Sequence, residues 1–253
     1  MAPESRAFES TLPLGATDLM RASEYRRYLA EAAPRDAESS PSRLGVLSPS
    51  LMQDLLRFEQ KGRQSEVLEV LAAGVRHGRD LLVQLQSGEL VVPLTVFPAQ
   101  RLVHCPLPIE EFLALPLSQL QVLQVESAVL RPPGDRDTAL VGERQRYTPL
   151  GPVLWELALR GSREELLPEI GGMAAYRITP SLDLRSLSLS GALNAAVRRL
   201  QRHTTNLREM SEWPGLNRAR ATRLLNGLYL QAGLMISRTH PAATNDGWVS
   251  GGR

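Results

Sequence analysis

The sequence predicts an α+β fold, in which an N-terminal domain of mixed helix and antiparallel sheet precedes a mainly helical, winged-helix-like domain. Between residues 80 and 96 apolar residues alternate with a period of two, as in half-buried strands. From residue 191 onward they recur at spacings of three and four, as on one face of a helix. A long polar stretch from Arg131 to Pro149 separates the two patterns. Loops of that length inside a compact domain are uncommon unless they are linkers or functional, so we predict a domain boundary there.

Length and composition indicate an ordinary globular protein. The 253 residues are enough for one large domain or two small ones. With only 5% aromatic residues, Leu, Val and Ala must fill the core. The single cysteine, Cys105, excludes an internal disulfide and a multi-cysteine zinc site, and we expect it to be buried. No apolar run is long enough for a membrane helix and the first residues do not read as a signal peptide, so the default expectation is a cytoplasmic protein without a membrane partner.

We expect residues 1–43 to hold one N-terminal helix and a linker. The helix is predicted over residues 16–33, and residues 34–41 have the Pro, Ser, Asp and Glu content of a linker. The apolar anchors of the helix are Leu19, Tyr25, Tyr28 and Leu29.

The predicted α+β domain covers residues 44–132 and starts with two helices. The first begins near Ser48-Pro49, because proline is tolerated in a first turn, and Gly62 ends it. The second covers residues 64–76. Their apolar faces are Leu51, Leu55 and Phe58 in the first and Val67, Leu68, Leu71 and Val75 in the second.

A β-hairpin is predicted over residues 80–96, with a two-residue turn at Ser87-Gly88. That turn would pair three apolar couples on one face, namely Leu85 with Leu90, Val83 with Val92, and Leu81 with Leu94. Pro93 cannot donate to a ladder and favours an edge or a bulge. A strand at 101–105, a short helix at 110–114 and a strand at 119–128 complete this domain.

The linker loop is predicted at residues 133–149 and the helical domain at 150–253. Helices are expected at 151–160 and 163–170, and a strand at 175–179. Trp155 has Val153, Leu154, Leu157 and Ala158 around it, so we expect it to be buried between the two domains and to fix their orientation.

The last third contains a helix, a short helix, a turn, a longer helix and a strand. A helix starts at 191–200, and Asn206 with Glu209 forms a capping pair for the short helix. Residues 213–215 make a turn, and the long helix covers 217–232 with Gly233 as the residue after its cap. Its core stripe is Ala221, Leu224, Leu225, Leu228 and Ala232, and residues 234–237 follow as a strand.

The segment 207–235 resembles winged helix-turn-helix modules. In it an apolar-anchored short helix precedes Gly215-Leu216, and a Leu224-Leu225-x-x-Leu228 helix runs into Gly233-Leu234. The resemblance implies a winged-helix-like module at residues 191–240. The layout is also similar to bacterial regulatory proteins that join a small β-rich domain to a winged helix, through the Phe-x-x-x-Arg-Leu-Val-His stretch at 97–104.

Charge and the helical wheel give two interpretations of the module. The chain is net +2, but residues 191–253 carry nine basic against three acidic side chains. Arginine makes up 28 of the 29 basic residues, a bias that a GC-rich genome also produces. Opposite the core stripe, the wheel places Arg223, Asn226, Gly227 and Leu230. An outward Leu230 and its neighbour Tyr229 favour a protein interface, whereas Arg218 and Arg220 at the helix start favour DNA. The candidate contact residues are Arg198, Arg199, Arg202, Arg218, Arg220, Arg223, Asn226, Tyr229 and Leu230.

Catalytic and metal-binding motifs are not apparent in the sequence. None of the four histidines has another His or a Cys at helical ligand spacing, and no Walker loop, nucleophile elbow or Gly-x-Gly-x-x-Gly occurs. We therefore expect no cofactor, metal or small-molecule ligand. The sequence predicts a non-enzymatic regulatory or adaptor protein that acts through protein contacts or self-association. The alternative is a DNA-binding transcriptional regulator that uses the 217–232 helix, and an enzyme of unknown type is the least favoured.

Overall fold

The fold was obtained as a computed structural model and combines helices with antiparallel sheets, which confirms the predicted α+β class. The structure describes residues 19–32, 49–59, 67–183 and 187–245, so the expected linker at 34–41 lies outside it. The helices are α1 (Ala22–Ala32), α2 (Pro49–Glu59), α3 (Val67–His77), α4 (Ile109–Ala114), α5 (Leu150–Arg160), α6 (Gly191–Arg202), α7 (Leu207–Ser211) and α8 (Arg218–Leu230). The strands are β1 (Leu81–Ser87), β2 (Leu90–Phe97), β3 (Leu102–His104), β4 (Gln121–Ser127), β5 (Tyr147–Pro149), β6 (Ala175–Ile178) and β7 (Leu234–Ser237).

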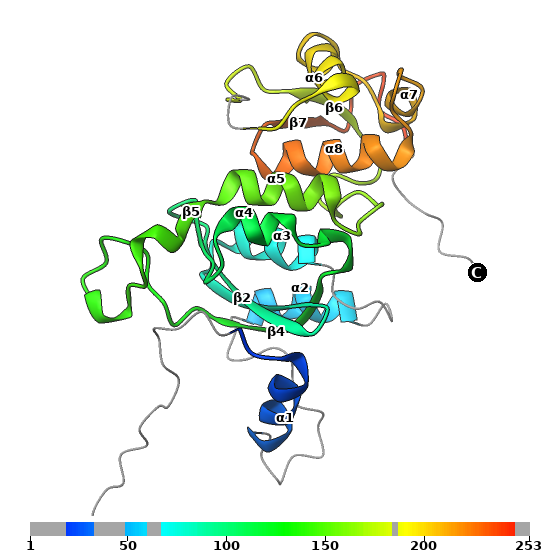
Figure 1. Ribbon diagram of the computed structural model, residues 1–253. Coiled ribbons are helices and arrows are strands. Elements are labelled where there is room, and N and C mark those ends of the chain that lie inside the picture. The colour runs from blue at the N-terminus through cyan, green and yellow to red at the C-terminus, as the bar shows by residue number, and fades with distance from the viewer. Residues whose placement is uncertain (1–18, 33–48, 60–66, 184–186, 246–253) are drawn as a thin grey trace, which may run out of the picture.

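The larger sheet has five antiparallel strands in the order β4-β1-β2-β3-β5. Its inner face carries the alternating apolar side chains of β1 and β2 and is covered by α3 and α5, while α1 lies on the opposite face (Figure 1). The anchors of α1 agree with the prediction at Tyr25, which is buried, but Tyr28 is 56% exposed. Side-chain surroundings of the predicted anchors Leu55 and Phe58 lie outside the described residues.

The hairpin forms with the predicted faces but with a shifted register. Leu85 pairs with Val92 and Val83 with Leu94, so each partner is two residues further along than expected. The turn occupies Gly88-Glu89 instead of Ser87-Gly88, because glycine takes the first central position, with φ of +59°. A shift of two residues keeps every side chain on its original face, and for that reason the core was predicted correctly.

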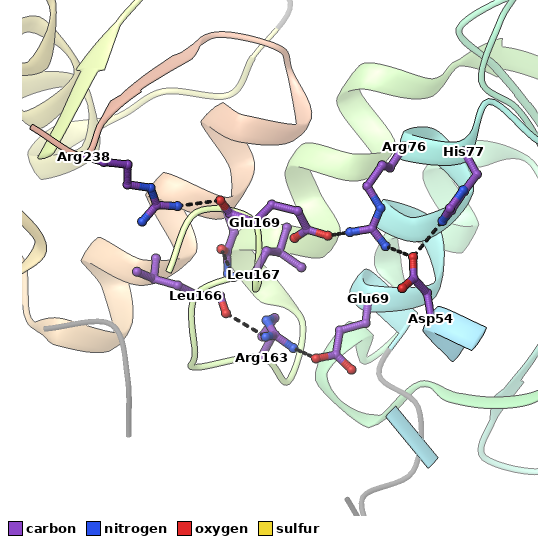
Figure 2. Close-up of polar contacts among 10 residues, drawn as sticks. Asp54, Glu69, Arg76, His77, Arg163, Leu166, Leu167, Glu169 and Arg238 are labelled. Carbon is purple, nitrogen blue, oxygen red and sulfur yellow. Dashed lines mark hydrogen bonds and ion pairs between the residues drawn. The ribbon is translucent and has the colours of Figure 1, made fainter. Parts of the chain in front are cut away.

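Residues 163–170, predicted as a helix, form an irregular segment with a turn at its end. Side chains of α8 and of Arg238 bind several of their backbone groups, and these bonds replace hydrogen bonds that a helix would have made. We call residues 161–174 the junction segment. It lies beside α8 and faces α2 and α3 on its other side (Figure 2).

The hydrophobic core runs from the five-stranded sheet to the C-terminal elements as one cluster of buried residues. Residues 147–149, which we expected in a linker, instead form the edge strand β5 of the first sheet. Helix α5 follows β5 directly and packs against α8, and β6 pairs with β7 beyond it (Figure 1). The last three residues of the predicted linker are therefore part of the first sheet.

The C-terminal end of α8 provides a first testable prediction. Ala232, and not Gly233 as expected, adopts the left-handed conformation after the cap, with φ of +55°. The Gly233 amide then donates to Leu228 O at 2.9 Å and the Ala232 amide to Tyr229 O at 2.8 Å, which is a Schellman arrangement. A left-handed alanine is strained by about 1 kcal/mol.

Ala232→Gly is accordingly expected to raise the free energy of unfolding by about 1 kcal/mol, measured by denaturant titration. Ala195→Gly is the control, because Ala195 is an exposed residue inside α6 and glycine there should lower stability by about 1 kcal/mol. Equal effects of the two substitutions would contradict the strain at Ala232.

Candidate functional site

The α8 face that the helical wheel placed outward is enclosed by the protein. Leu230 is 3% exposed, Asn226 is fully buried and Gly227 is buried, so the prediction of an outward contact surface at these residues is wrong. The wheel assumed a single core, but α8 lies between α5 on one side and α7 and β7 on the other (Figure 1). Both long faces of α8 are used inside the chain.

Asn226 holds the junction segment against α8. Its Oδ1 accepts a hydrogen bond from the Leu167 amide at 2.9 Å, and its Nδ2 donates to Glu165 O at 3.0 Å. Asparagine is a poor residue for a helix interior unless its side chain has such partners. The prediction that Asn226 reads a base or phosphate is therefore replaced by an internal role.

Trp155 of α5 packs directly on α8 at Gly227. A Cβ built on Gly227 would lie 2.9 Å from Trp155 Cε3 and 3.5 Å from Ala158 Cβ. Glycine at this position lets the indole ring approach the backbone of α8, and the tryptophan is fully buried. The expected burial of Trp155 is confirmed, and its contact with α8 lies within the predicted helical domain.

A set of ion pairs connects the junction segment to α3, and α3 to α2 (Figure 2). Arg163, only 6% exposed, pairs with Glu69 of α3 and donates to Leu166 O at 2.8 Å. Arg76 of α3 contacts Glu169 and also Asp54 of α2, and His77 lies 2.7 Å from the same Asp54 oxygen. Buried charges are retained in proteins when they are paired in this way.

Arg238, just after β7, joins the opposite side of the junction segment. Its guanidinium donates to Glu169 O at 2.8 Å and Met173 O at 3.0 Å, and it also contacts Gly171 O. Sequence reasoning missed Arg163, Glu69 and Arg238, because partners 65 to 94 residues apart leave no periodic trace in a sequence.

The predicted arginines divide into two groups. Arg223 faces the junction segment, where its Nε donates to Arg163 O at 3.2 Å and its Nη2 lies 3.3 Å from Glu164. The other five are exposed, and Tyr229 is partly buried against the core. The exposed arginines are Arg198, Arg199 and Arg202 on α6 and Arg218 and Arg220 at the start of α8.

Helices α6 and α7 bring the exposed arginines next to an aromatic residue. The Arg199 guanidinium carbon lies 4.5 Å from the ring centroid of Trp213, and Arg199 is 3.6 Å from Glu209. The Asn206 side chain caps α7 by accepting from the Glu209 amide at 2.8 Å, as the sequence predicts. At α8, Asn217 Oδ1 accepts from the Arg220 amide at 2.8 Å, and Arg220 Nη1 donates to Gly215 O at 2.6 Å. We call Arg198, Arg199, Arg202, Arg218 and Arg220 the arginine surface.

Burial shifts the pKa of two neighbouring side chains at the end of β3. Cys105 is buried, as predicted, and desolvation raises the pKa of its thiol to about 11. Desolvation likewise lowers the pKa of His104 below its ordinary value, and the nearby Arg146 adds to this effect. The His104 ring stacks edge-on against Tyr147, whose hydroxyl donates to Arg131 O at 2.6 Å.

Within the described residues, no group of three or more His, Cys, Asp or Glu side chains is arranged to hold a metal ion. None of the helices in those same parts of the chain has the length and apolarity needed to cross a bilayer. Comparison of the chain with protein-family models, with curated proteins and with solved structures finds no match.

Proposed function

We propose that this protein is a non-enzymatic regulatory or adaptor protein whose C-terminal, winged-helix-like module binds an acidic segment of a partner protein through the arginine surface. The order α6, α7, α8 and β7, with β6 paired to β7, supports the comparison with a winged helix. The enclosure of α8 is the observation that carries the proposal. Because α5 and the junction segment cover the α8 face that would enter a DNA groove, the surface left for a partner is the arginine surface.

The composition of that surface favours a protein partner. Glu209 and Glu212 lie among its arginines, so the surface is not the continuous basic track that a long phosphate backbone follows, whereas a short acidic segment can contact the separate guanidinium groups. The Arg199–Trp213 stack holds one guanidinium in place and leaves it 49% exposed, so a partner carboxylate can contact it beside Glu209. The excess of basic side chains in residues 191–253 supports the alternative of a DNA-binding regulator.

The test compares a fluorescent Glu- and Asp-rich peptide with a duplex DNA at about 0.1 M salt, by anisotropy on the full chain. We expect the peptide to bind better than the duplex. Replacing Arg198, Arg199 and Arg202 together by alanine should weaken peptide binding about tenfold, since exposed ion pairs contribute roughly 0.5 kcal/mol each.

The control replaces two exposed arginines of the loop between β4 and β5, Arg136 and Arg144, and should leave the peptide affinity unchanged. Tight duplex binding that is lost when Arg218, Arg220 and Arg223 become alanine would establish the DNA-binding alternative instead. Peptide binding unaffected by the α6 triple substitution would also overturn the proposal.

A further inference from the structure

Strand β7 has an open edge. It pairs with β6 on one side, and no strand lies on its other side within the described residues (Figure 1). Opposite Ile236, Tyr176 of β6 exchanges both of its main-chain hydrogen bonds with Thr205, at 2.6 and 3.0 Å, so its amide and carbonyl point away from β7. In an antiparallel pair, two opposite residues either bond each other or both face outward. The amide and carbonyl groups of Ile236 and, by alternation, those of Leu234 are therefore directed outward.

The open edge of β7 is uncharged and partly exposed. Met235 is 41% exposed, and Leu234 and Ile236, on the other face, are half-buried against the core. Sheet edges that stay single usually carry a lysine, a proline or a bulge. Strand β7 has none of these, because its four residues are Leu, Met, Ile and Ser and its pairing with β6 is regular. The edge therefore fits an uncharged, apolar strand.

We propose that β7 pairs with β7 of a second copy of the chain, antiparallel and about a two-fold axis at Met235. In this register Leu234 of each copy lies opposite Ile236 of the other, and each pair exchanges its outward amide–carbonyl hydrogen bonds. The two Met235 side chains meet across the axis on the exposed face. On the inner face the Leu234 and Ile236 side chains cover each other, which buries apolar surface that a single copy leaves partly exposed.

The occupant is a second copy because β7 is itself the strand that its edge requires. It is uncharged and apolar and has the same outward groups in the same positions, so a two-fold axis satisfies both copies at once. An acidic segment, by contrast, would bring carboxylates against Leu234 and Ile236. Arg177 is exposed and lies across from Met235 on β6. Its two copies would be about 14 Å apart, beyond the Debye length of about 10 Å at 0.1 M salt, so their repulsion is largely screened.

Pairing through β7 ends at two copies. The far side of β6 is already bonded, by Thr205 at Tyr176 and by Thr244 at Ala174. Strand β6 thus offers no second edge to which further copies could add, and the interface closes on itself. The dimer does not depend on the arginine surface, which lies on α6 and at the start of α8.

Sedimentation velocity of the full chain from about 1 to about 300 μM tests the proposal. We expect a reversible monomer–dimer equilibrium with a Kd of about 10–100 μM, because so short an interface is weak. Met235→Lys places two like charges directly opposite each other and should weaken the dimer about tenfold or more. Met235→Glu should weaken it as well, but a mixture of the two variants should regain the dimer, since the register places residue 235 of one copy against residue 235 of the other.

Ile236→Pro separates pairing between copies from pairing within the chain. Residue 236 does not donate to β6, so proline removes only the outward amide and should abolish the dimer. The matched control is Val129→Lys, because Val129 is an apolar residue, 65% exposed, that follows the edge strand β4, and this variant should dimerise like the parent. At about 1 μM, where the chain is monomeric, the Met235 variants should unfold at the same denaturant concentration as the parent, which shows that they fold.

A parent chain that stays monomeric at about 300 μM would overturn the proposal and leave the edge to a different protein. A dimer that Met235→Lys leaves intact while Val129→Lys weakens it would place the contact at β4 and overturn the proposal as well. A mixture of the two Met235 variants that dimerises no better than either alone would contradict the two-fold register.

Discussion

Replacing Trp155 by alanine is expected to lower the free energy of unfolding by about 3–5 kcal/mol, because large buried aromatic residues cost this much to truncate. The indole is fully buried, and it fills the space that Gly227 leaves on α8. A Cβ at position 227 would lie 2.9 Å from the ring, so the ring already occupies the space beside the glycine. Denaturant unfolding followed by far-ultraviolet circular dichroism measures the loss.

Trp155→Phe is the control for this prediction. It retains a ring in the space between α5 and α8 and should cost clearly less than the alanine variant. An alanine variant that unfolds at the same denaturant concentration as the parent would contradict the role of Trp155. Two separate unfolding transitions in Trp155→Ala, with one in the parent, would show that the tryptophan couples the two halves of the chain.

Patterns between residues close in the sequence correctly predicted strand faces, a helix cap and the burial of Trp155. The period of two placed β1 and β2 with their core faces correct even though the turn moved, because parity survives a shift of two residues. The predicted cap Asn206 acts over three residues at the start of α7, and Asn217, predicted as the first residue of the long helix, is the cap of α8. Trp155 was predicted to be buried because Val153, Leu154, Leu157 and Ala158 around it are apolar, and it is buried.

The wrong predictions for α8 and for residues 163–170 have one physical cause. Helix α8 packs against other parts of the chain on two faces, whereas the sequence pattern shows only one. A helical wheel shows the face that meets the first core, and it assigned Leu230 to solvent because that residue lies opposite Leu224 and Leu228. The same effect removed the helix predicted at 163–170, where bonds to Asn226 replace helical hydrogen bonds. One signal was available: an asparagine at the centre of a helix flanked by leucines suggests a buried partner.

Asn226→Ala is expected to lower the free energy of unfolding by about 2–4 kcal/mol. The substitution leaves the Leu167 amide and the Glu165 carbonyl without their partner, and each orphaned group costs about 1–3 kcal/mol when buried. The better helix propensity of alanine returns only about 0.5 kcal/mol of this loss.

Asn226→Asp separates the two hydrogen bonds, because aspartate can still accept from the Leu167 amide but cannot donate to Glu165 O. Arg220→Ala is the control at an exposed position of the same helix and should change stability by less than about 0.5 kcal/mol. Hydrogen exchange at the Leu167 amide gives a local readout, since losing its acceptor should speed exchange there even where global stability is restored by Ala232→Gly. Unchanged protection of that amide in Asn226→Ala would show that Asn226 does not hold the junction segment against α8.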